Sequence, residues 1–200
     1  MEWRPITKRY EETAIILDFL PAGYAEEGKP LRVQEPVAQA IGETYFTLLE
    51  LLPKPGVHLH PHERVNIGKE KRDKIEHVKR RLSYNELTAT AKIELPYVVE
   101  DIIKANEPRF IDFFNNSKPI TTRYHQLELL PGIGKKIMWD IINERQKGPF
   151  TSFKDLHERV PNVPDPTKML VRRVIMELER KDKYLLFVRR KPRREERTTP

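Results

Sequence analysis

The sequence predicts an α+β protein in which short strands come first and helices follow. Three observations lead to this fold class. β-branched and apolar runs that end at proline and glycine fill the first 80 or so residues, which is typical of short strands. From Ser83 onward the apolar residues follow helical spacing. Finally, 200 residues with 38% hydrophobic side chains suit two modest cores better than one large core.

Four runs in the first part of the chain have the character of strands: Thr13–Leu20, Tyr45–Leu52, Arg64–Gly68 and Val78–Leu82. The first two are closed by turn residues, Pro21-Ala22-Gly23 and Pro53-Lys54-Pro55-Gly56. Short strands separated by such turns predict a small β-barrel over residues 1–83.

Helix boundaries are predicted by capping residues and prolines. Ser83 followed by Glu86 is a capping-box pattern that begins a helix. Leu95-Pro96 predicts the start of another helical run, and Asn106 with Pro108 predicts its end and the start of the next. An aromatic stripe with an expected role in core packing follows, made of Phe110, Phe113 and Phe114.

The most informative segment is Leu127-Glu128-Leu129-Leu130-Pro131-Gly132-Ile133-Gly134-Lys135-Lys136. It resembles a helix-hairpin-helix motif over residues 122–145, with a first helix over about 122–130 and a second over about 135–145. Met138 stands where this motif usually has a small residue at the helix contact, so a wider helix crossing is expected.

The residues of this hairpin suit a phosphate group. Gly132 and Gly134 allow backbone angles closed to other residues and let a phosphate approach the main chain. The N–H groups at the start of the second helix then face that phosphate, and Lys135 and Lys136 add positive charge. Ile133 is expected to anchor the hairpin under the helices. Such contacts hold a backbone and read no bases.

A second, degenerate copy is predicted over residues 153–180. Phe153, Leu156 and Val160 have helical spacing and precede Pro161-Asn162-Val163-Pro164, and Thr167–Glu179 is an amphipathic run. Asparagine and proline replace both glycines, so close approach of a phosphate is not expected here. Contacts with a backbone are expected instead from three basic side chains, Lys168, Arg172 and Arg173. Both copies would lie in a helical domain over residues 84–182.

The order of these features resembles an uncharacterised archaeal protein family, domain of unknown function 655, which joins an oligonucleotide/oligosaccharide-binding (OB) barrel to a tandem helix-hairpin-helix domain. The resemblance covers nearly the whole chain and depends on Arg64–Lys69, Ser83–Leu87, Leu127–Lys136 and Pro149–Phe153. It implies nucleic-acid binding, with RNA as the favoured ligand. OB barrels stack bases on aromatic rings beside a basic groove, and the candidate rings are Tyr24, Tyr45 and Tyr84.

Residues 183–200 are expected to form a C-terminal strand and a basic tail. Tyr184–Val188 is strand-like and is expected to join the N-terminal sheet, whereas Arg189–Pro200 is too charged and proline-rich to pack. The segment Lys168–Arg197 holds 12 basic and 5 acidic residues, and this surplus equals the net charge of +7. Together with a pI of about 9.5, it favours a polyanionic partner.

Composition excludes several classes of site. The chain has no cysteine, which excludes disulfides, thiolate metal sites and cysteine nucleophiles. It has no apolar run of the roughly 20 residues that span a bilayer, and Met1–Arg4 lacks a signal-peptide core. A cytoplasmic location is therefore expected.

Three patterns typical of enzymes or metal sites also occur. Asp165 and Glu179 have the spacing of a metal-dependent nuclease, but a helix between them would hold them about 20 Å apart. Asp155 falls at the interval of a glycosylase aspartate, although on a helix of the second copy. Three alternating histidines lie in His58–His62, where prolines favour a loop. We therefore expect no catalytic residue, no cofactor and no metal site.

The leading hypothesis is a non-enzymatic protein that grips the phosphate backbone of RNA or DNA without base-specific readout. Its expected nucleic-acid-binding residues are Gly132, Ile133, Gly134, Lys135, Lys136, Lys168, Arg172 and Arg173. The first alternative is a protein-interaction module that docks on a ribosomal or transcription assembly, and the second is a metal-dependent nuclease or glycosylase-like enzyme. The sequence indicates neither a membrane nor a small-molecule substrate, and it leaves strandedness and oligomeric state open.

Overall fold

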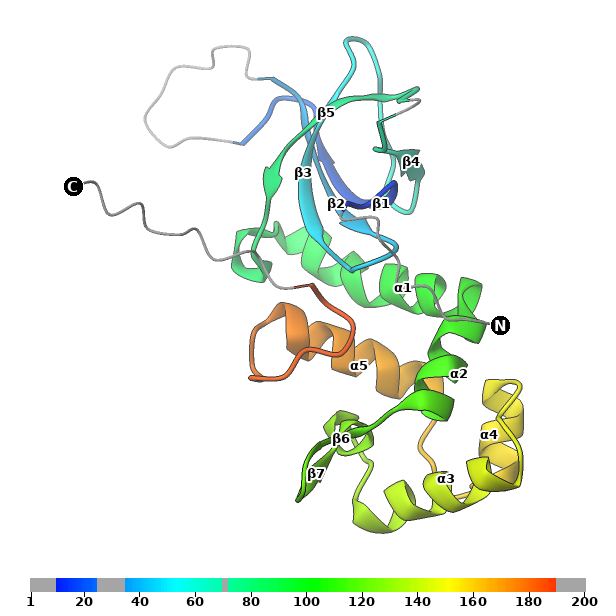
Figure 1. The fold of residues 1–200 in the computed structure, drawn as a ribbon. Coiled ribbons are helices and arrows are strands. Elements are labelled where there is room, and N and C mark those ends of the chain that lie inside the picture. The colour runs from blue at the N-terminus through cyan, green and yellow to red at the C-terminus, as the bar shows by residue number, and fades with distance from the viewer. Residues whose placement is uncertain (1–9, 25–34, 70–71, 190–200) are drawn as a thin grey trace, which may run out of the picture.

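A computed structural model describes residues 10–24, 35–69 and 72–189. A curled, antiparallel five-stranded sheet comes first in the chain and forms a half-barrel at one end of the molecule, and the helices follow it (Figure 1). The predicted α+β class, with a barrel-like N-terminal part followed by helices, is confirmed.

The strands are β1 (Thr13–Leu20), β2 (Val37–Gly42), β3 (Leu48–Pro53), β4 (Arg64–Asn66) and β5 (Ile75–Arg81). Their order in the sheet is β4-β1-β2-β3-β5, so β4 and β5 are the edges and the half-barrel is open between them. Each of the four predicted runs overlaps one strand, although β5 begins three residues before its predicted run. The sequence prediction missed β2, because all six of its residues are buried and it shows no alternation of polar and apolar side chains.

The interior of the half-barrel is an apolar cluster of Ala14, Ile16, Ala38, Ala40, Leu49, Leu51, Leu59, Val65, Ile67 and Ile75. One polar side chain, Gln39, is fully buried beside it. Its Nε2 donates to the Tyr24 hydroxyl (3.1 Å) and to the Glu86 carbonyl (3.0 Å), and its Oε1 accepts from the Thr88 backbone N–H (2.9 Å). Gln39 therefore fastens β2 to the segment that leads into the first helix.

The helical part contains η1 (Tyr84–Glu86), α1 (Ala89–Ala105), α2 (Glu107–Asn116), η2 (Gln126–Leu129), α3 (Lys135–Lys147), α4 (Phe153–Arg159) and α5 (Pro166–Leu178), where η marks a 3₁₀ helix. A short hairpin of β6 (Pro119–Thr121) and β7 (Tyr124–His125) lies between α2 and η2. The predicted boundary at Asn106 is confirmed, because this residue ends α1 and precedes α2.

The capping box at Ser83 is present, but it begins a 3₁₀ turn. The Glu86 carboxylate accepts from the Ser83 N–H (2.7 Å), and this bond, with Arg80 and the Ser83 hydroxyl, lowers the pKa of Glu86 to about 2. Helix α1 begins later, where the Thr88 hydroxyl accepts from the Ala91 N–H (3.0 Å). The predicted helix start at Leu95-Pro96 was therefore wrong, since Pro96 lies inside α1 at the expense of one helical hydrogen bond.

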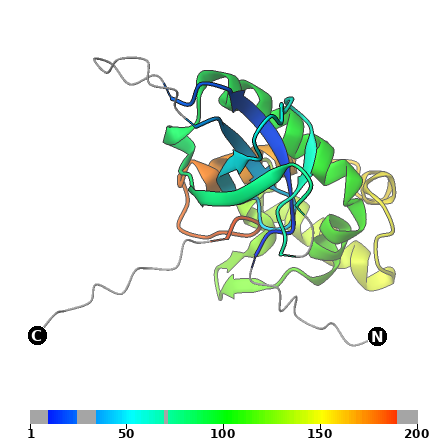
Figure 2. The ribbon, with the colours of Figure 1, turned by 90° about the horizontal axis from the view of Figure 1, so that it is seen from above.

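Helix α1 lies between the sheet and α5 (Figure 1), and the view from above shows the half-barrel over the helices (Figure 2). One continuous buried cluster joins Leu17 of β1 and Phe46 of the β2–β3 turn to α1, α2 and α5. Phe110 and Phe114 are fully buried in it, which confirms the predicted core role of this stripe, and Phe113 packs against its side. The division into separate modules remains a prediction.

The predicted C-terminal strand was wrong. Residues 184–188 form no strand, because three of their backbone N–H groups bind the buried carboxylate of Glu177. Phe187 then enters the core, where its ring lies 5.5 Å from that of Phe110. The basic tail over residues 190–200 lies outside the described residues. Within the described ranges, no helix is long and apolar enough to cross a membrane.

Candidate nucleic-acid interface

The segment before the loop Pro131–Gly134, called the glycine loop below, differs from the prediction. An α-helix over 122–130 was expected, but these residues form β7 and then η2, a 3₁₀ turn of four residues. The β6–β7 pairing extends to His125, and the His125 Nδ1 accepts from the Leu127 N–H (3.1 Å), which leaves room only for this turn. The second predicted helix is confirmed as α3, which begins at Lys135.

The two glycines of the loop have different roles. Gly132 has a φ of +89°, and a Cβ there would lie 2.8 Å from the Pro164 side chain. Gly132 is thus required both by its backbone angle and by its packing against the turn before α5. Gly134 has an ordinary φ of −90° and is the N-cap of α3, and a Cβ there would meet nothing within 4 Å. The fold does not require a glycine at 134, and the space in front of it is open.

The start of α3 is positively charged and exposed. No side chain caps it, and the first N–H groups of a helix have no partners within the helix. Lys135 and Lys136 are exposed, and within the described part of the chain neither side chain has an ion pair or hydrogen bond. Ile133 is only 5% exposed and anchors the loop in the core, as expected. Positive charge and open space therefore meet at this helix end.

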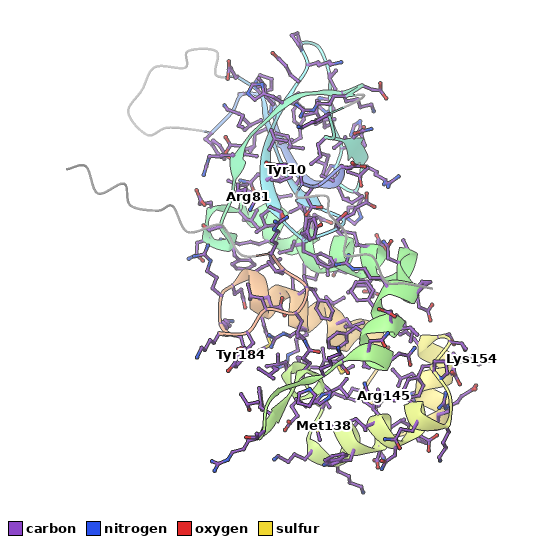
Figure 3. All side chains as sticks on the ribbon, viewed as in Figure 1. Tyr10, Arg81, Met138, Arg145, Lys154 and Tyr184 are labelled. Atoms are coloured by element: carbon purple, nitrogen blue, oxygen red, sulfur yellow. The ribbon has the colours of Figure 1, made fainter. Side chains whose placement is uncertain are left out.

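Helix α3 is held in place from its other end. Arg145, labelled in Figure 3, donates to the Phe114 carbonyl (2.9 Å), to the Ser117 hydroxyl (3.0 Å) and to the Ser117 carbonyl (3.1 Å). Met138, the large residue at the predicted helix contact, is 6% exposed and belongs to the core. The carboxyl end of α3 is thus held against the end of α2. Helix α3 lies at the end of the molecule opposite the half-barrel (Figure 1).

A second set of basic residues lies on α5 beside the loop. Arg172 is exposed and lines an open groove together with Gly132 and Gly134. Lys168 is exposed one turn earlier on the same helix. In the described ranges, the side chains of Arg172 and Lys168 have no ion pair or hydrogen bond. The structure thus brings the glycine loop and Arg172 to one groove.

Arg173 does not fit the phosphate contact expected of it. Its side chain is 1% exposed and pairs with Glu177 (2.7 Å) and with Asp182 (2.7 Å). The guanidinium also donates to the Leu129 carbonyl (3.0 Å) and to the Tyr184 carbonyl. Arg173 is therefore a structural residue under the loop, and the sequence alone does not distinguish it from its exposed neighbour Arg172.

The predicted second pair of helices is present as α4 and α5, with Pro164 of their turn packed on Gly132. Asp165 caps α5, where its carboxylate accepts from the Lys168 N–H (3.0 Å), and Glu179 is the C-cap of the same helix. The two carboxylates of the nuclease-like pattern therefore lie at opposite ends of α5.

Asp155, which has the spacing of a glycosylase aspartate, and His62, one of the three alternating histidines, both interact with neighbouring side chains or backbone groups. The Asp155 carboxylate accepts from the Thr151 N–H (2.9 Å), which lowers the pKa of Asp155, and it lies 3.5 Å from Arg159. The Nε2 atom of His62 lies 2.7 Å from Glu94. Among the residues described, no group of three or more histidine and carboxylate side chains is arranged to hold a metal ion.

The three barrel tyrosines proposed for base stacking are half-buried. The Tyr24 hydroxyl donates to Glu50 (2.8 Å), and burial raises the pKa of Tyr24. Lys92 lies over the ring of Tyr84 at 5.6 Å, and Arg189 lies over the ring of Tyr45 at 5.1 Å. These rings are occupied by the protein's own side chains or hydrogen bonds.

The exposed aromatic residues that the sequence prediction missed include Tyr10 and Trp139. Tyr10 is 68% exposed and lines the opening of the half-barrel between β4 and β5, together with Arg81 (Figure 3). Trp139 is 56% exposed on α3, one turn after Lys135. The spacing of Trp139 from Lys135 and Lys136 is visible in the sequence and is the signal that could have identified it.

The fold and this surface define an α+β protein with a half-barrel, a helical part and an exposed basic loop. A family model described as "Protein of unknown function (DUF655)" matches residues 10–189, so the chain belongs to this family. The resemblance expected from the sequence is confirmed.

Two relatives illustrate the similarity. The chain is 50% identical over 184 residues to "Uncharacterized protein MJ0038" of Methanocaldococcus jannaschii, a match that covers 91% of this chain and 82% of the relative. It is also similar to the crystal structure of Af1531 from Archaeoglobus fulgidus, with a TM-score of 0.82 and 49% identity. That match covers 90% of this chain and all of the other. The family is thus one of uncharacterised archaeal proteins.

Proposed function

We propose that this protein binds nucleic acid, with RNA favoured, by gripping a backbone phosphate at the loop Pro131–Gly134 and the start of α3. The observation that carries this proposal is the open space before Gly134, at an uncapped helix end where Lys135 and Lys136 have no partner in the described ranges. Free N–H groups, a helix dipole and two lysines at one point match the charge and geometry of a phosphate.

The loop is proposed to act as the hairpin of a helix-hairpin-helix motif whose first helix is shortened to η2. Pro164 against Gly132 supports a paired arrangement, since it joins this loop to the turn between α4 and α5. Lys168 and Arg172 would extend the contact along the backbone from α5. Contacts of this kind are electrostatic and position a polymer without reading its sequence.

The half-barrel supports the same class of ligand. Its sheet is open between β4 and β5, and the opening is lined by Tyr10, by four basic residues and by two glutamates, Glu11 and Glu12. Small OB barrels bind oligonucleotides on a comparable surface. We propose RNA as the ligand because the chain combines a half-barrel with a loop suited to a phosphate. We also propose that the protein is located in the cytoplasm.

Gly134→Asp is the sharpest test of the proposed contact. Aspartate is a favourable N-cap, the backbone at 134 is already in the extended conformation of an N-cap, and a Cβ there meets nothing. The substitution should therefore preserve the fold while it places a carboxylate where the phosphate would lie. We expect fluorescence anisotropy with labelled RNA and DNA at low salt to show binding by the wild type and little by Gly134→Asp.

Lys54→Ala is the matched control, because it changes the net charge by the same amount at an exposed residue of a barrel loop. It should leave the affinity within about twofold, the scale of a distant surface charge. Equal binding by wild type and Gly134→Asp, with an unchanged melting temperature, would reject the loop as the contact.

The protein-interaction alternative has one specific observation in its favour. Ile93 and Tyr97 of α1 are 64% and 59% exposed and line a groove against α5. If the wild type binds no nucleic acid at low salt, this groove becomes the leading surface. We propose no catalytic step. Loss of labelled RNA or DNA during long incubation with Mg²⁺ or Mn²⁺ would contradict that, and the loss should then depend on Asp165, Glu179 or Asp155.

A further inference from the structure

Trp139 is a large aromatic side chain with no visible role in the fold. It is 56% exposed, and within the described part of the chain its ring stacks on no aromatic side chain and its indole N–H has no acceptor. Buried tryptophans usually pack their rings and bond their N–H groups. Trp139 leaves both unused, and more than half of its surface is open to a ligand.

The position of Trp139 relates it to the proposed phosphate contact. It follows Lys136 by three residues and Lys135 by four, and side chains with these spacings lie on one face of a helix. At about 1.5 Å per residue, its Cα lies roughly 6 Å along the axis from the first residue of α3. This offset is comparable with one nucleotide of an extended strand.

A second exposed aromatic ring lies in the groove beside the loop. Tyr124 is 37% exposed and lines the groove that also contains Gly132, Gly134 and Arg172. Its ring is 6.3 Å from that of Tyr184, so it has a supporting neighbour behind it. The basic loop is therefore flanked by exposed aromatic surface on α3 and in its own groove.

We infer that the ligand of this surface is a single-stranded nucleic acid, one of whose unpaired bases stacks on Trp139 while the adjacent phosphate lies at Gly134. This inference depends on the proposed function and adds the strandedness of the ligand. In a duplex the faces of the bases are covered by their neighbours, and only an unpaired base can stack on an aromatic side chain. Lysines that attract phosphates and a ring that accepts a base face are the two elements of single-strand binding.

The fluorescence of Trp139 can be used to detect stacking of a base on its ring. The chain has two tryptophans, Trp3 and Trp139, so a Trp3→Phe variant leaves Trp139 as the only one. We would titrate this variant with a 12-nucleotide RNA without self-complementarity and with the corresponding duplex. Stacking of a base should quench the Trp139 emission with the single strand and not with the duplex. The single strand should also bind more tightly at equal salt.

Three variants separate stacking from general attraction. Trp139→Ala should weaken binding of the single strand by about 5- to 150-fold, the range of base–aromatic stacking, and should leave duplex binding unchanged. Trp139→Phe, which keeps a flat ring, should restore most of the affinity. His60→Ala, which removes an exposed ring from the loop between β3 and β4, is the control and should have no effect.

The outcomes distinguish this inference from the proposed function. Salt-sensitive binding that Gly134→Asp abolishes, but that shows no quenching and no effect of Trp139→Ala, would overturn the stacking inference and leave the phosphate contact in place. Equal affinity for single strand and duplex would overturn it in the same way. No binding of either RNA at low salt would reject both proposals together.

Discussion

Arg173 and Glu177 form a buried ion pair on α5, with the guanidinium Nε 2.7 Å from the carboxylate and both residues 1% exposed. The pair connects distant parts of the chain. Arg173 donates to the Leu129 carbonyl just before the glycine loop, and Glu177 accepts from the N–H groups of Phe187 and Val188. The position of the proposed phosphate loop and that of the C-terminal segment therefore depend on the same two side chains.

Loss of either member of this pair should destabilise the protein strongly. Glu177→Ala leaves the buried guanidinium with Asp182 as its remaining carboxylate partner and leaves three backbone N–H groups without their acceptor. We expect the free energy of unfolding to fall by about 3–5 kcal/mol. Urea denaturation followed by circular dichroism measures this change. Glu179→Ala, which removes the half-buried carboxylate paired with exposed Lys181 at the end of the same helix, is the control and should lower the free energy by less than about 1 kcal/mol. Similar small losses in both variants would contradict the structural role.

The two glycines of the loop should respond differently to substitution. Gly132→Ala forces a Cβ onto a positive φ and to within 2.8 Å of Pro164, so we expect a loss of about 2–4 kcal/mol in the free energy of unfolding. Gly134→Ser places a good N-cap residue in open space and should change the free energy by less than about 1 kcal/mol. Thermal denaturation of the two variants side by side tests this, and equal shifts in melting temperature would contradict the assigned roles.

The parts of the fold that the sequence predicts are those with local causes. The capping box of Ser83 and the boundary at Asn106 depend on residues within four positions, and both are present. By contrast, the conformation of residues 184–188 depends on Glu177, which is buried only when the chain folds back on α5. Strand propensity predicts a strand there, and a tertiary contact overrides it.

In the candidate site, too, the sequence predicts residues whose positions have local causes and does not predict those placed by tertiary contacts. Ile133 and the exposed lysines of the loop follow from the motif, whereas the inward position of Arg173 does not. Arg172 and Arg173 are adjacent and chemically identical, and only packing against Leu129 and the C-terminal segment determines which one is buried. The spacing of Arg173 and Glu177 permits an ion pair on a helix, but the sequence gives no sign of its burial.

His125 should make the stability of the protein depend on pH. Burial, together with the nearby Arg145 charge, lowers the pKa of His125 below its usual 6.5, and its Nδ1 accepts from the Leu127 N–H in the neutral form. The folded state thus binds a proton less readily than the unfolded state. The stabilisation is present above the unfolded pKa and is lost as the pH falls through the folded pKa.

The measurement for His125 compares urea midpoints at about pH 7.5 and 5.5, values that bracket the usual histidine pKa. Asparagine can accept the Leu127 N–H and does not titrate, so His125→Asn should show a smaller decrease in midpoint than the wild type. His157→Asn changes an exposed histidine and should behave like the wild type. An unchanged pH dependence in His125→Asn would show that other groups cause it.

The salt dependence of binding should identify which cations meet phosphates. Each phosphate contact releases counterions, so Lys135→Ala should reduce the slope of log affinity against log salt by about 1, and Arg172→Ala should do the same if Arg172 touches the backbone. Neither variant should alter the melting temperature appreciably, because both side chains are exposed and have no ion pair in the described part of the chain. Lys54→Ala gives the slope expected when a charge of the same sign is removed from a distant loop. If Lys135→Ala and Lys54→Ala change the slope equally, the attraction is spread over the whole basic surface and the start of α3 is not a specific contact.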